Sequence, residues 1–253
     1  WPRSGSAHRR RVASPPMSAD RPLQVTLDEG VAVLQLDDGK ANAISHEVIG
    51  RVHDALDRSL EEAGAVALVG RPGRFSAGFD LSVMTAGDQP MQELVLAGAE
   101  LLLRLYGHPQ PVVAACTGHA LAGGALLLLA ADSRIGAAGE YRIGLNEVAI
   151  GMALPVFAVE LARDRLATTE LTAATVQAKE YGPDAAVAAG YLDAVVPADD
   201  VVAAAVTEAR RLGEMRRGAV AQTKKRLRSA TLQRIRATLD EDVAGLQMSS
   251  GPR

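Results

Sequence analysis

Residues 111–132, PVVAACTGHALAGGALLLLAAD, contain the pattern from which the central unit of the fold can be predicted. The apolar run Val112 to Cys116 predicts a buried strand. The uncharged run from residue 120 to residue 131 predicts a buried helix that begins near Gly123 and Gly124. A strand that leads through a glycine-containing turn into a helix presents free backbone N–H groups at the partly positive end of that helix.

Two interpretations of this turn are open from the stretch alone. Glycine lets a substrate oxygen approach the backbone, and a pair of N–H groups aimed at developing negative charge forms an oxyanion hole. The alternative is an ordinary buried strand–helix unit that binds nothing, since glycine is common at such turns. A second glycine turn, RPGRFSAGFDL at 71–81, follows a predicted strand at Ala65–Val69 and would supply the second donor. Its G-x4-G spacing lacks the Lys-Ser/Thr of a phosphate-binding P-loop.

The remaining chain alternates strand and helix signals, which predicts an α/β fold with strands buried by helices. The expected elements are a hairpin over 23–28 and 31–37, a helix capped by Ser45, a helix over 91–105, strands at 132–136 and 192–196, helical stretches within 155–177 and 183–189, and helices from Asp199 onward.

Composition narrows the class of protein. The 253 residues suit one large domain, and 48% hydrophobic with 3% aromatic residues indicates an aliphatic core. The single cysteine, Cys116, excludes a disulfide framework and a thiolate zinc site. It also fits a reducing compartment, so we expect a cytoplasmic protein. A net charge of −3 gives no long-range attraction to nucleic acid or acidic membranes, and neither is expected as a partner.

Residues 1–19 differ from the rest, with four arginines and no acidic residue. Such a start could be a transit peptide. We favour an upstream extension or a cloning remnant, because Met17 resembles a natural start. We expect this segment to be flexible and exclude it from the fold.

Three motifs carry a family resemblance: RFSAGFDL at 74–81, ACTGHALAGGALLLLAADSRI at 115–135 and YRIGLNEVAIGM at 141–152. In this order and spacing they resemble the crotonase (enoyl-CoA hydratase/isomerase) superfamily, over about residues 23–250. The resemblance implies a crotonase-like ββα spiral core at 20–197 and a C-terminal helical trimerisation region at 198–253. It also implies a homotrimer or a dimer of trimers.

The resemblance further implies an acyl-CoA substrate whose thioester carbonyl sits between the backbone N–H groups of Phe79 and Gly123. Coenzyme A is then part of the substrate, and no separate cofactor or metal is expected. The implied substrate and CoA contacts are Lys40, Ala41, Ala43, Ala77, Gly78, Asp80, Leu81 and Leu126.

The acidic residues distinguish between activities. Hydratases of the family carry a glutamate three residues after the oxyanion glycine, and that position is Leu126 here; the second family glutamate matches Glu147. One acid facing a hydrophobic wall resembles the Δ3,Δ2-enoyl-CoA isomerases of fatty-acid metabolism, in which a single carboxylate moves a proton from C2 to C4. Hydration is served better by two acids, because water must be deprotonated while C2 receives a proton. A glutamate beside a leucine is poorly solvated, which raises its pKa.

Three alternatives remain at this point: a hydratase that uses Glu147 despite Leu126, a non-catalytic acyl-CoA binding protein, and a Glu147 that is an ordinary surface residue. Other candidate residues have structural interpretations. We expect structural roles for His119 and Cys116. The spacing of His46, His53 and His108 does not fit a metal site. Ser76 does not lie in a nucleophile-elbow motif.

Two features of the C-terminal region allow two readings each. The basic residues form either a solvated face or partners of the CoA phosphates, and they are Arg210, Arg211, Arg216, Arg217 and Lys224 to Arg228. The apolar stripe packs either on its own domain or on a neighbouring subunit, and it consists of Leu232, Ile235, Leu239, Val243 and Leu246.

Overall fold

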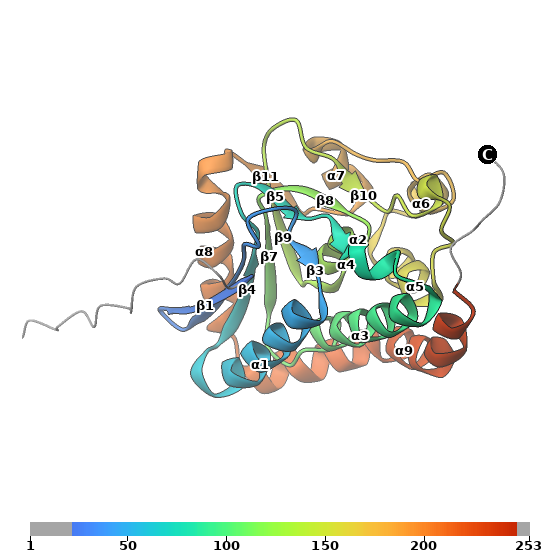
Figure 1. The fold of residues 1–253 in the computed structure, drawn as a ribbon. Coiled ribbons are helices and arrows are strands. Elements are labelled where there is room, and N and C mark those ends of the chain that lie inside the picture. Colours follow the sequence, from blue (N-terminus) through green and yellow to red (C-terminus); the bar gives the residue numbers. More distant parts are fainter. Residues whose placement is uncertain (1–21, 247–253) are drawn as a thin grey trace, which may run out of the picture.

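The computed structural model describes residues 22–246, and the expected extension at 1–19 lies outside them. A six-stranded sheet in the order β1-β2-β4-β7-β9-β11 forms the centre (Figure 1). Strands β1 (Leu23–Asp28) and β2 (Val31–Leu36) make the predicted antiparallel hairpin. Glu29 and Gly30 join them with φ of 45° and 84°, as a tight hairpin turn requires.

The other strands of this sheet run parallel: β4 (Ala65–Val69), β7 (Val112–Cys116), β9 (Ser133–Ala137) and β11 (Ala194–Val196). Every residue of β4 and β7 is buried, because helices cover both faces of the sheet. Helix α8 (Val201–Gly213) covers one face alone, and most of the remaining helices lie on the other (Figure 1). The predicted α/β class is confirmed.

Two small sheets bring the glycine turns together. One has the order β10-β8-β5, and the other pairs β3 with β6. Their strands are β3 (Ala43–Ile44), β5 (Gly73–Ser76), β6 (Gly78–Phe79), β8 (Gly118–Leu121) and β10 (Ile143–Gly144).

The predicted start of the buried helix near Gly123 and Gly124 is confirmed, because the helix spans Gly123–Ala130. Residues 120–121 of the uncharged run belong to strand β8, which the sequence pattern does not show. Gly118 permits the strand, since a Cβ there would lie 2.0 Å from the carbonyl carbon of Gly73 on β5. Strands of two to four residues are too short to show alternation, so periodicity alone does not reveal them.

The helices that position the site begin where the sequence predicts a cap or a glycine. Helix α1 (His46–Glu62) starts at Ser45, whose Oγ accepts the Val48 N–H at 3.2 Å. Helix α4 (Gly123–Ala130) is buried along its whole length. The other helices are α2 (Leu81–Met84), α3 (Asp88–Tyr106), η1 (Val148–Ile150), α5 (Val156–Arg165), α6 (Leu171–Thr175), α7 (Pro183–Ala189), η2 (Ala198–Asp200) and α9 (Arg217–Ala244).

Helix α9 lies along α3 and α5 of its own chain (Figure 1). From the apolar stripe, Ile235, Leu239, Val243 and Leu246 are buried in the main core. The stripe therefore packs on its own domain, as one of the two interpretations predicts. Contact with a neighbouring subunit stays a prediction, as does a domain boundary near residue 197.

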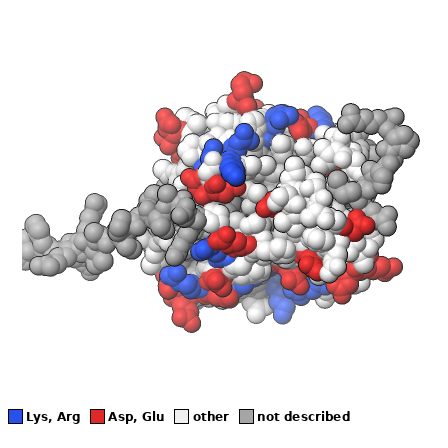
Figure 2. Space-filling view, in the orientation of Figure 1, with Lys and Arg blue, Asp and Glu red and all other residues white. Residues whose placement is uncertain are grey.

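The predicted solvated face on α9 is wrong at two positions. Lys224 and Arg228 are buried, and both form ion pairs with Asp132, at 2.5 Å and 3.0 Å. Asp132 is about 90 residues away in the sequence. The local run of basic residues therefore predicts an exposed surface, although two of its members are buried. Elsewhere charges of both signs intermingle on the face shown in Figure 2. Within residues 22–246, every helix is too short or too polar to cross a membrane.

Candidate active site

An apolar cavity of about 340 Å³ lies between β6, the start of α4, α2 and η1. It brings together residues that are far apart in the sequence. The predicted site residues that line it are Ala41, Ala43, Ala77, Gly78, Phe79, Leu81, Leu126 and Glu147. The remaining wall is largely hydrophobic and includes Met84, Val95, Met152, Phe157 and Leu246.

Lys40 and Asp80 lie outside this cavity, in an adjoining cleft that shares Ala41, Ala43 and Leu81 with it. Lys40 is exposed. Asp80 caps α2, where its carboxylate accepts the Ser82 N–H at 2.9 Å. The structure therefore places these two predicted contacts in the adjoining cleft and not in the cavity itself.

Two backbone segments meet at the cavity wall: one contains Gly78 and Phe79, and the other contains Ala122 and Gly123. A Cβ on Gly78, which has φ +94°, would lie 3.0 Å from the Gly123 nitrogen. As the first residue of α4, Gly123 has no acceptor one helical turn back for its N–H. Ala122 before it has φ 50° and ψ −125°, a strained conformation for a residue with a side chain, and such strain concentrates at functional sites. Phe79 and Gly123, the predicted donors, thus lie on adjacent backbone segments.

Asn42 holds the segment that carries Phe79. It lies in the left-handed region with φ 53° and is buried. Its amide donates to the carbonyl oxygens of Leu36 at 3.0 Å and Phe75 at 3.2 Å, and its own carbonyl accepts the Ser76 hydroxyl at 2.7 Å. No motif in the sequence predicts this role for Asn42. The only local signal is an asparagine in a turn-like run, and asparagine tolerates positive φ.

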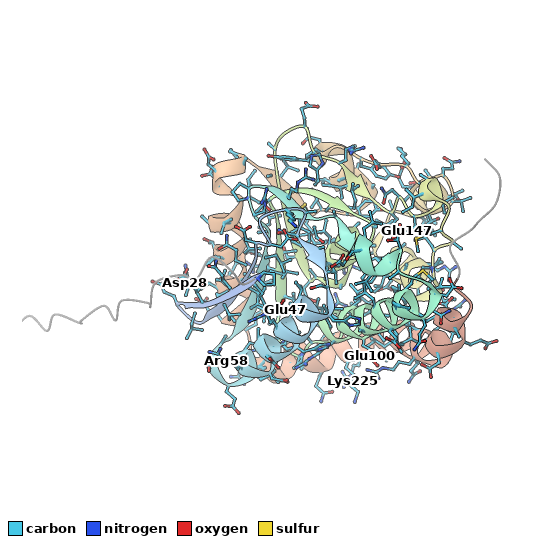
Figure 3. The ribbon with its side chains drawn as sticks, viewed as in Figure 1. Asp28, Glu47, Arg58, Glu100, Glu147 and Lys225 are labelled. Atoms are coloured by element: carbon cyan, nitrogen blue, oxygen red, sulfur yellow. The ribbon has the colours of Figure 1, made fainter. Side chains whose placement is uncertain are left out.

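Glu147 is the buried acid of the cavity. The residue is only 8% exposed, and Figure 3 labels it beside the ribbon that Figure 1 names α2. The carboxylate atom Oε2 has no hydrogen-bond partner among residues 22–246. Burial raises the pKa of this carboxyl from 4.5 to about 7, opposed only by the residue's own backbone N–H. The reading of Glu147 as a surface residue is therefore wrong.

Leu126 occupies the position where the family's hydratases carry a second glutamate, and it lines the same cavity as Glu147. It is 1% exposed and lies on the buried helix α4. Among the described residues that line this cavity, Glu147 alone has an ionisable side chain. The wall around it offers no ionised partner, which is why desolvation dominates the rise in its pKa.

The other candidates have structural surroundings. His119 Nδ1 accepts the Arg142 N–H at 3.0 Å, and its ring meets Tyr141 edge-on. Burial raises the pKa of the Cys116 thiol to about 12, so this cysteine is a poor nucleophile. Residues 22–246 contain no group of three or more His, Cys, Asp or Glu side chains arranged to hold a metal ion.

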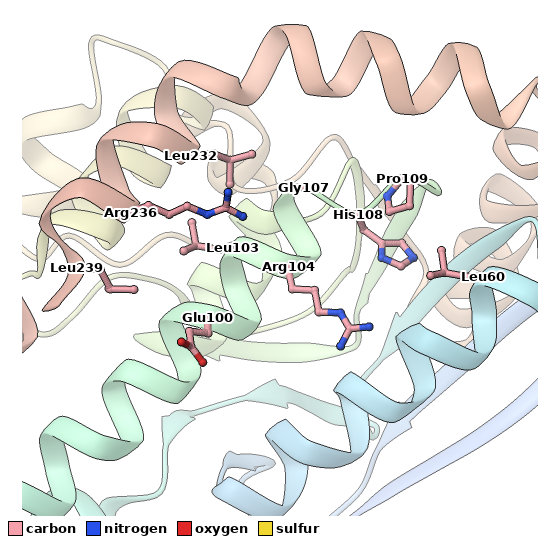
Figure 4. Close-up of a pocket in the computed structure, with 10 residues that line it drawn as sticks. All are labelled: Leu60, Glu100, Leu103, Arg104, Gly107, His108, Pro109, Leu232, Arg236 and Leu239. Atoms are coloured by element: carbon pink, nitrogen blue, oxygen red, sulfur yellow. The ribbon is translucent and has the colours of Figure 1, made fainter.

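A second cavity, of about 500 Å³, contains none of the predicted site residues (Figure 4). It lies between α1, α3 and α9, with Leu103, Arg104 and His108 on one side and Leu232, Arg236 and Leu239 on the other. Arg104 is engaged by Asp57 and by His53. This cavity is therefore separate from the candidate active site.

The fold and the cavity define an α/β protein with a mainly parallel sheet and a buried carboxyl group in an apolar pocket. The chain belongs to the enoyl-CoA hydratase/isomerase family, whose model matches residues 26–248. The resemblance to the crotonase superfamily is thereby confirmed.

Curated relatives and solved structures both match the chain. Human mitochondrial enoyl-CoA delta isomerase 1 is 33% identical, over 85% of this chain and 72% of the relative. A solved enoyl-CoA hydratase/isomerase family protein from Pseudomonas syringae is 41% identical with a TM-score of 0.87, over 89% of this chain and 98% of that one. A solved Mycobacterium tuberculosis enoyl-CoA isomerase is 39% identical with a TM-score of 0.85, over 89% and 99%. The chain spans 54% of the length of a probable enoyl-CoA hydratase from Bacillus subtilis and 72% of that of the human isomerase.

Proposed function

We propose that this protein is a Δ3,Δ2-enoyl-CoA isomerase of fatty-acid metabolism that uses Glu147 as its single proton-transferring group. The observation that carries the proposal is a buried carboxyl group whose Oε2 has no hydrogen-bond partner within residues 22–246, in a cavity where the family's second acid position is Leu126. The isomerase names of human and mouse relatives support it. Coenzyme A is part of the substrate.

In this mechanism the thioester oxygen accepts hydrogen bonds from the backbone N–H groups of Phe79 and Gly123. The Glu147 carboxylate takes a proton from C2, and the C2–H electron pair moves into the conjugated system, leaving negative charge on the thioester oxygen. The two N–H groups and the positive end of α4 stabilise that charge. Glu147 then returns the proton to C4, so the double bond moves from C3–C4 to C2–C3 with no other reactant consumed.

The pKa of Glu147 suits both halves of this transfer. A group with a pKa of about 7 is an effective base when ionised and an effective acid once it holds the proton. A carboxylate with an ordinary, lower pKa is a weaker base. Desolvation by the apolar wall raises the pKa of Glu147 and so increases the basicity that the first step needs. We therefore expect kcat/KM to rise with pH through about 7 and then level off.

Hydratase activity is the second candidate, because other relatives are named enoyl-CoA hydratases. Hydration requires a water molecule to be oriented and deprotonated at C3. The Leu126 side chain has no atom that can hydrogen-bond to that water. This difference favours isomerisation over hydration at this site.

The test is a paired assay of the purified protein with trans-3-hexenoyl-CoA and crotonyl-CoA. We expect conversion of the first and no hydration of the second. Glu147→Gln should lower kcat for isomerisation by about a hundredfold or more, since it removes the proton-transferring group. Glu140→Gln, at an exposed glutamate on the preceding loop, is the matched control and should leave kcat unchanged.

Each contrary result identifies a different function. Full isomerase activity in Glu147→Gln contradicts the proposed role of Glu147. Hydration of crotonyl-CoA by the unaltered protein establishes the hydratase alternative. Tight binding of both thioesters without turnover of either establishes a non-catalytic acyl-CoA binding protein. The predicted trimer and the cytoplasmic location are separate predictions, which mass measurement in solution and cell fractionation test.

A further inference from the structure

The candidate active-site cavity has an open end and a closed end. At the open end Leu81 and Ile150 are 68% and 58% exposed, and Leu81 also borders the adjoining cleft. The lining residues Val95, Phe157 and Leu246 are buried members of the main core, as are Met84 and Leu126. Met84 lies on α2 beside Leu81 and Leu126 belongs to the reacting centre, so we take the other three as the closed end that an acyl chain entering past Leu81 meets last.

Leu246 differs from Val95 and Phe157 because it does not lie within a regular helix. Val95 lies within α3 and Phe157 within α5, whereas Leu246 lies two residues beyond the end of α9. Its position therefore depends on contacts outside a regular helix. The Leu246 side chain is 9% exposed and contributes to both the core and the cavity wall.

Two polar contacts fasten this end of α9. The Gln92 side-chain amide on α3 donates to the carbonyl oxygens of Ala244 at 3.1 Å and Leu246 at 3.2 Å. The Asp242 carboxylate accepts the Val156 N–H at 2.6 Å, at the first residue of α5. Gln92 thus binds the carbonyl of the very residue whose side chain closes the cavity, from the same helix that contributes Val95.

We propose that Leu246 is the end wall that sets the longest acyl chain this protein accepts, and that Gln92 is the positioning residue that keeps the wall in place. This inference rests on the proposed acyl-CoA function. An apolar cavity discriminates chain length by the space it leaves, and one methylene group changes selectivity by about tenfold or more. Shortening Leu246 should lengthen the preferred acyl chain, and enlarging it should shorten that chain.

The primary measurement is the dissociation constant of a series of saturated acyl-CoAs, from butanoyl-CoA through octanoyl-CoA to dodecanoyl-CoA. Saturated thioesters have no double bond to move, so binding is measured independently of turnover. For Leu246→Ala we expect the tightest-binding chain to become longer, and the longest chain to bind about tenfold more tightly than it binds the unaltered protein. For Leu246→Phe we expect the opposite shift, which also keeps the test decisive if Leu246→Ala does not fold.

Leu239→Ala is the matched control for the end wall. Leu239 lies on the same α9, is 8% exposed, and faces the separate cavity shown in Figure 4. Its truncation should lower the melting temperature and leave the chain-length profile unchanged. A profile that shifts equally in Leu239→Ala would overturn the assignment of Leu246.

Gln92→Met tests the positioning role. Its control is Gln89→Met on the exposed side of α3, where the Gln89 side-chain amide donates to the Glu93 carboxylate at 3.0 Å. We expect Gln92→Met to shift the profile in the same direction as Leu246→Ala, and Gln89→Met to leave it unchanged. An unshifted profile in Gln92→Met refutes the positioning role. Purely structural damage would weaken all chain lengths together.

The two proposals fail in different ways. An unshifted profile in both Leu246 variants of a protein that isomerises 3-enoyl-CoA overturns the end wall alone. A shifted profile in a protein that binds acyl-CoA without isomerising it overturns the isomerase proposal alone.

Discussion

Glu147 carries an energetic cost that its surroundings do not offset. The carboxyl group is buried among apolar side chains, and Oε2 has no hydrogen-bond partner within residues 22–246. Ionising such a group in the folded protein is unfavourable, and the pKa rises from 4.5 to about 7 as a result. A site built for proton transfer therefore destabilises the fold that holds it.

The cost appears as a pH dependence of stability. Because the folded-state pKa is raised, the folded protein binds this proton more tightly than the unfolded chain does. The resulting stabilisation is fully present below pH 4.5 and is lost as pH rises through about 7. At about 1.4 kcal/mol per pKa unit, the loss is about 3 kcal/mol.

Glu147→Gln should remove this loss, since glutamine does not ionise. We expect the variant to be more stable than the unaltered protein above pH 7, by up to about 3 kcal/mol. Chemical denaturation across the range from pH 4.5 to above 7 measures the difference. Glu140→Gln is again the control, and a Glu147→Gln curve parallel to that of the unaltered protein would contradict the origin assigned to the raised pKa.

At the scale of elements, helix α4 is pressed against the strand that precedes Phe79. A Cβ on Gly124, the second residue of α4, would lie 2.2 Å from the Ser76 carbonyl oxygen. That atom belongs to the backbone, so relief requires the strand or the helix to move. The close approach is what brings the starts of α4 and β6 together at the cavity.

Gly124→Ala should therefore destabilise the protein by about 1–3 kcal/mol and lower activity at the same time. Gly218→Ala supplies the contrast, because Gly218 is the second residue of α9 and has open space around it. There alanine should raise stability by up to about 1 kcal/mol through its higher helix propensity. Thermal unfolding and the isomerase assay measure both effects, and equal behaviour of the two variants would disprove the close-packing argument.

Local patterns predicted the elements that have local causes. The hairpin at Glu29 and Gly30 and the cap at Ser45 follow from turn and capping chemistry within a few residues. Strands β3, β5, β6, β8 and β10 follow from pairing between segments up to several tens of residues apart, and the sequence showed them only as glycine turns. Asn42, whose amide bonds to Phe75, was missed for the same reason.

Across the whole molecule, α9 joins the N-terminal ends of the interior strands β7 and β9 to the closed end of the cavity. Near its start Lys224 and Arg228 bind Asp132, and Lys224 also donates to the Gln110 carbonyl at 2.8 Å. Near its end Gln92 and Asp242 fasten it to α3 and α5. The partners are as much as 154 residues apart in the sequence. Motifs of neighbouring residues were therefore enough to predict roles for Phe79, Gly123 and Glu147. They could not predict that Leu246 lines the cavity or that Lys224 is buried, because those positions depend on long-range contacts.

Lys224→Met should show how much the long-range attachment of α9 contributes. Burial lowers the pKa of Lys224, opposed by Asp132, and removing the ammonium group leaves Asp132 with Arg228 as its remaining charged partner. We expect a loss of about 2–3 kcal/mol in the free energy of unfolding, the range for a hydrogen bond to a buried charge. Lys225→Met, at the exposed neighbouring residue labelled in Figure 3, should change it by less than about 0.5 kcal/mol. If the two variants lose the same stability, Asp132 does not hold α9 to the sheet, and the apolar stripe alone must account for its position.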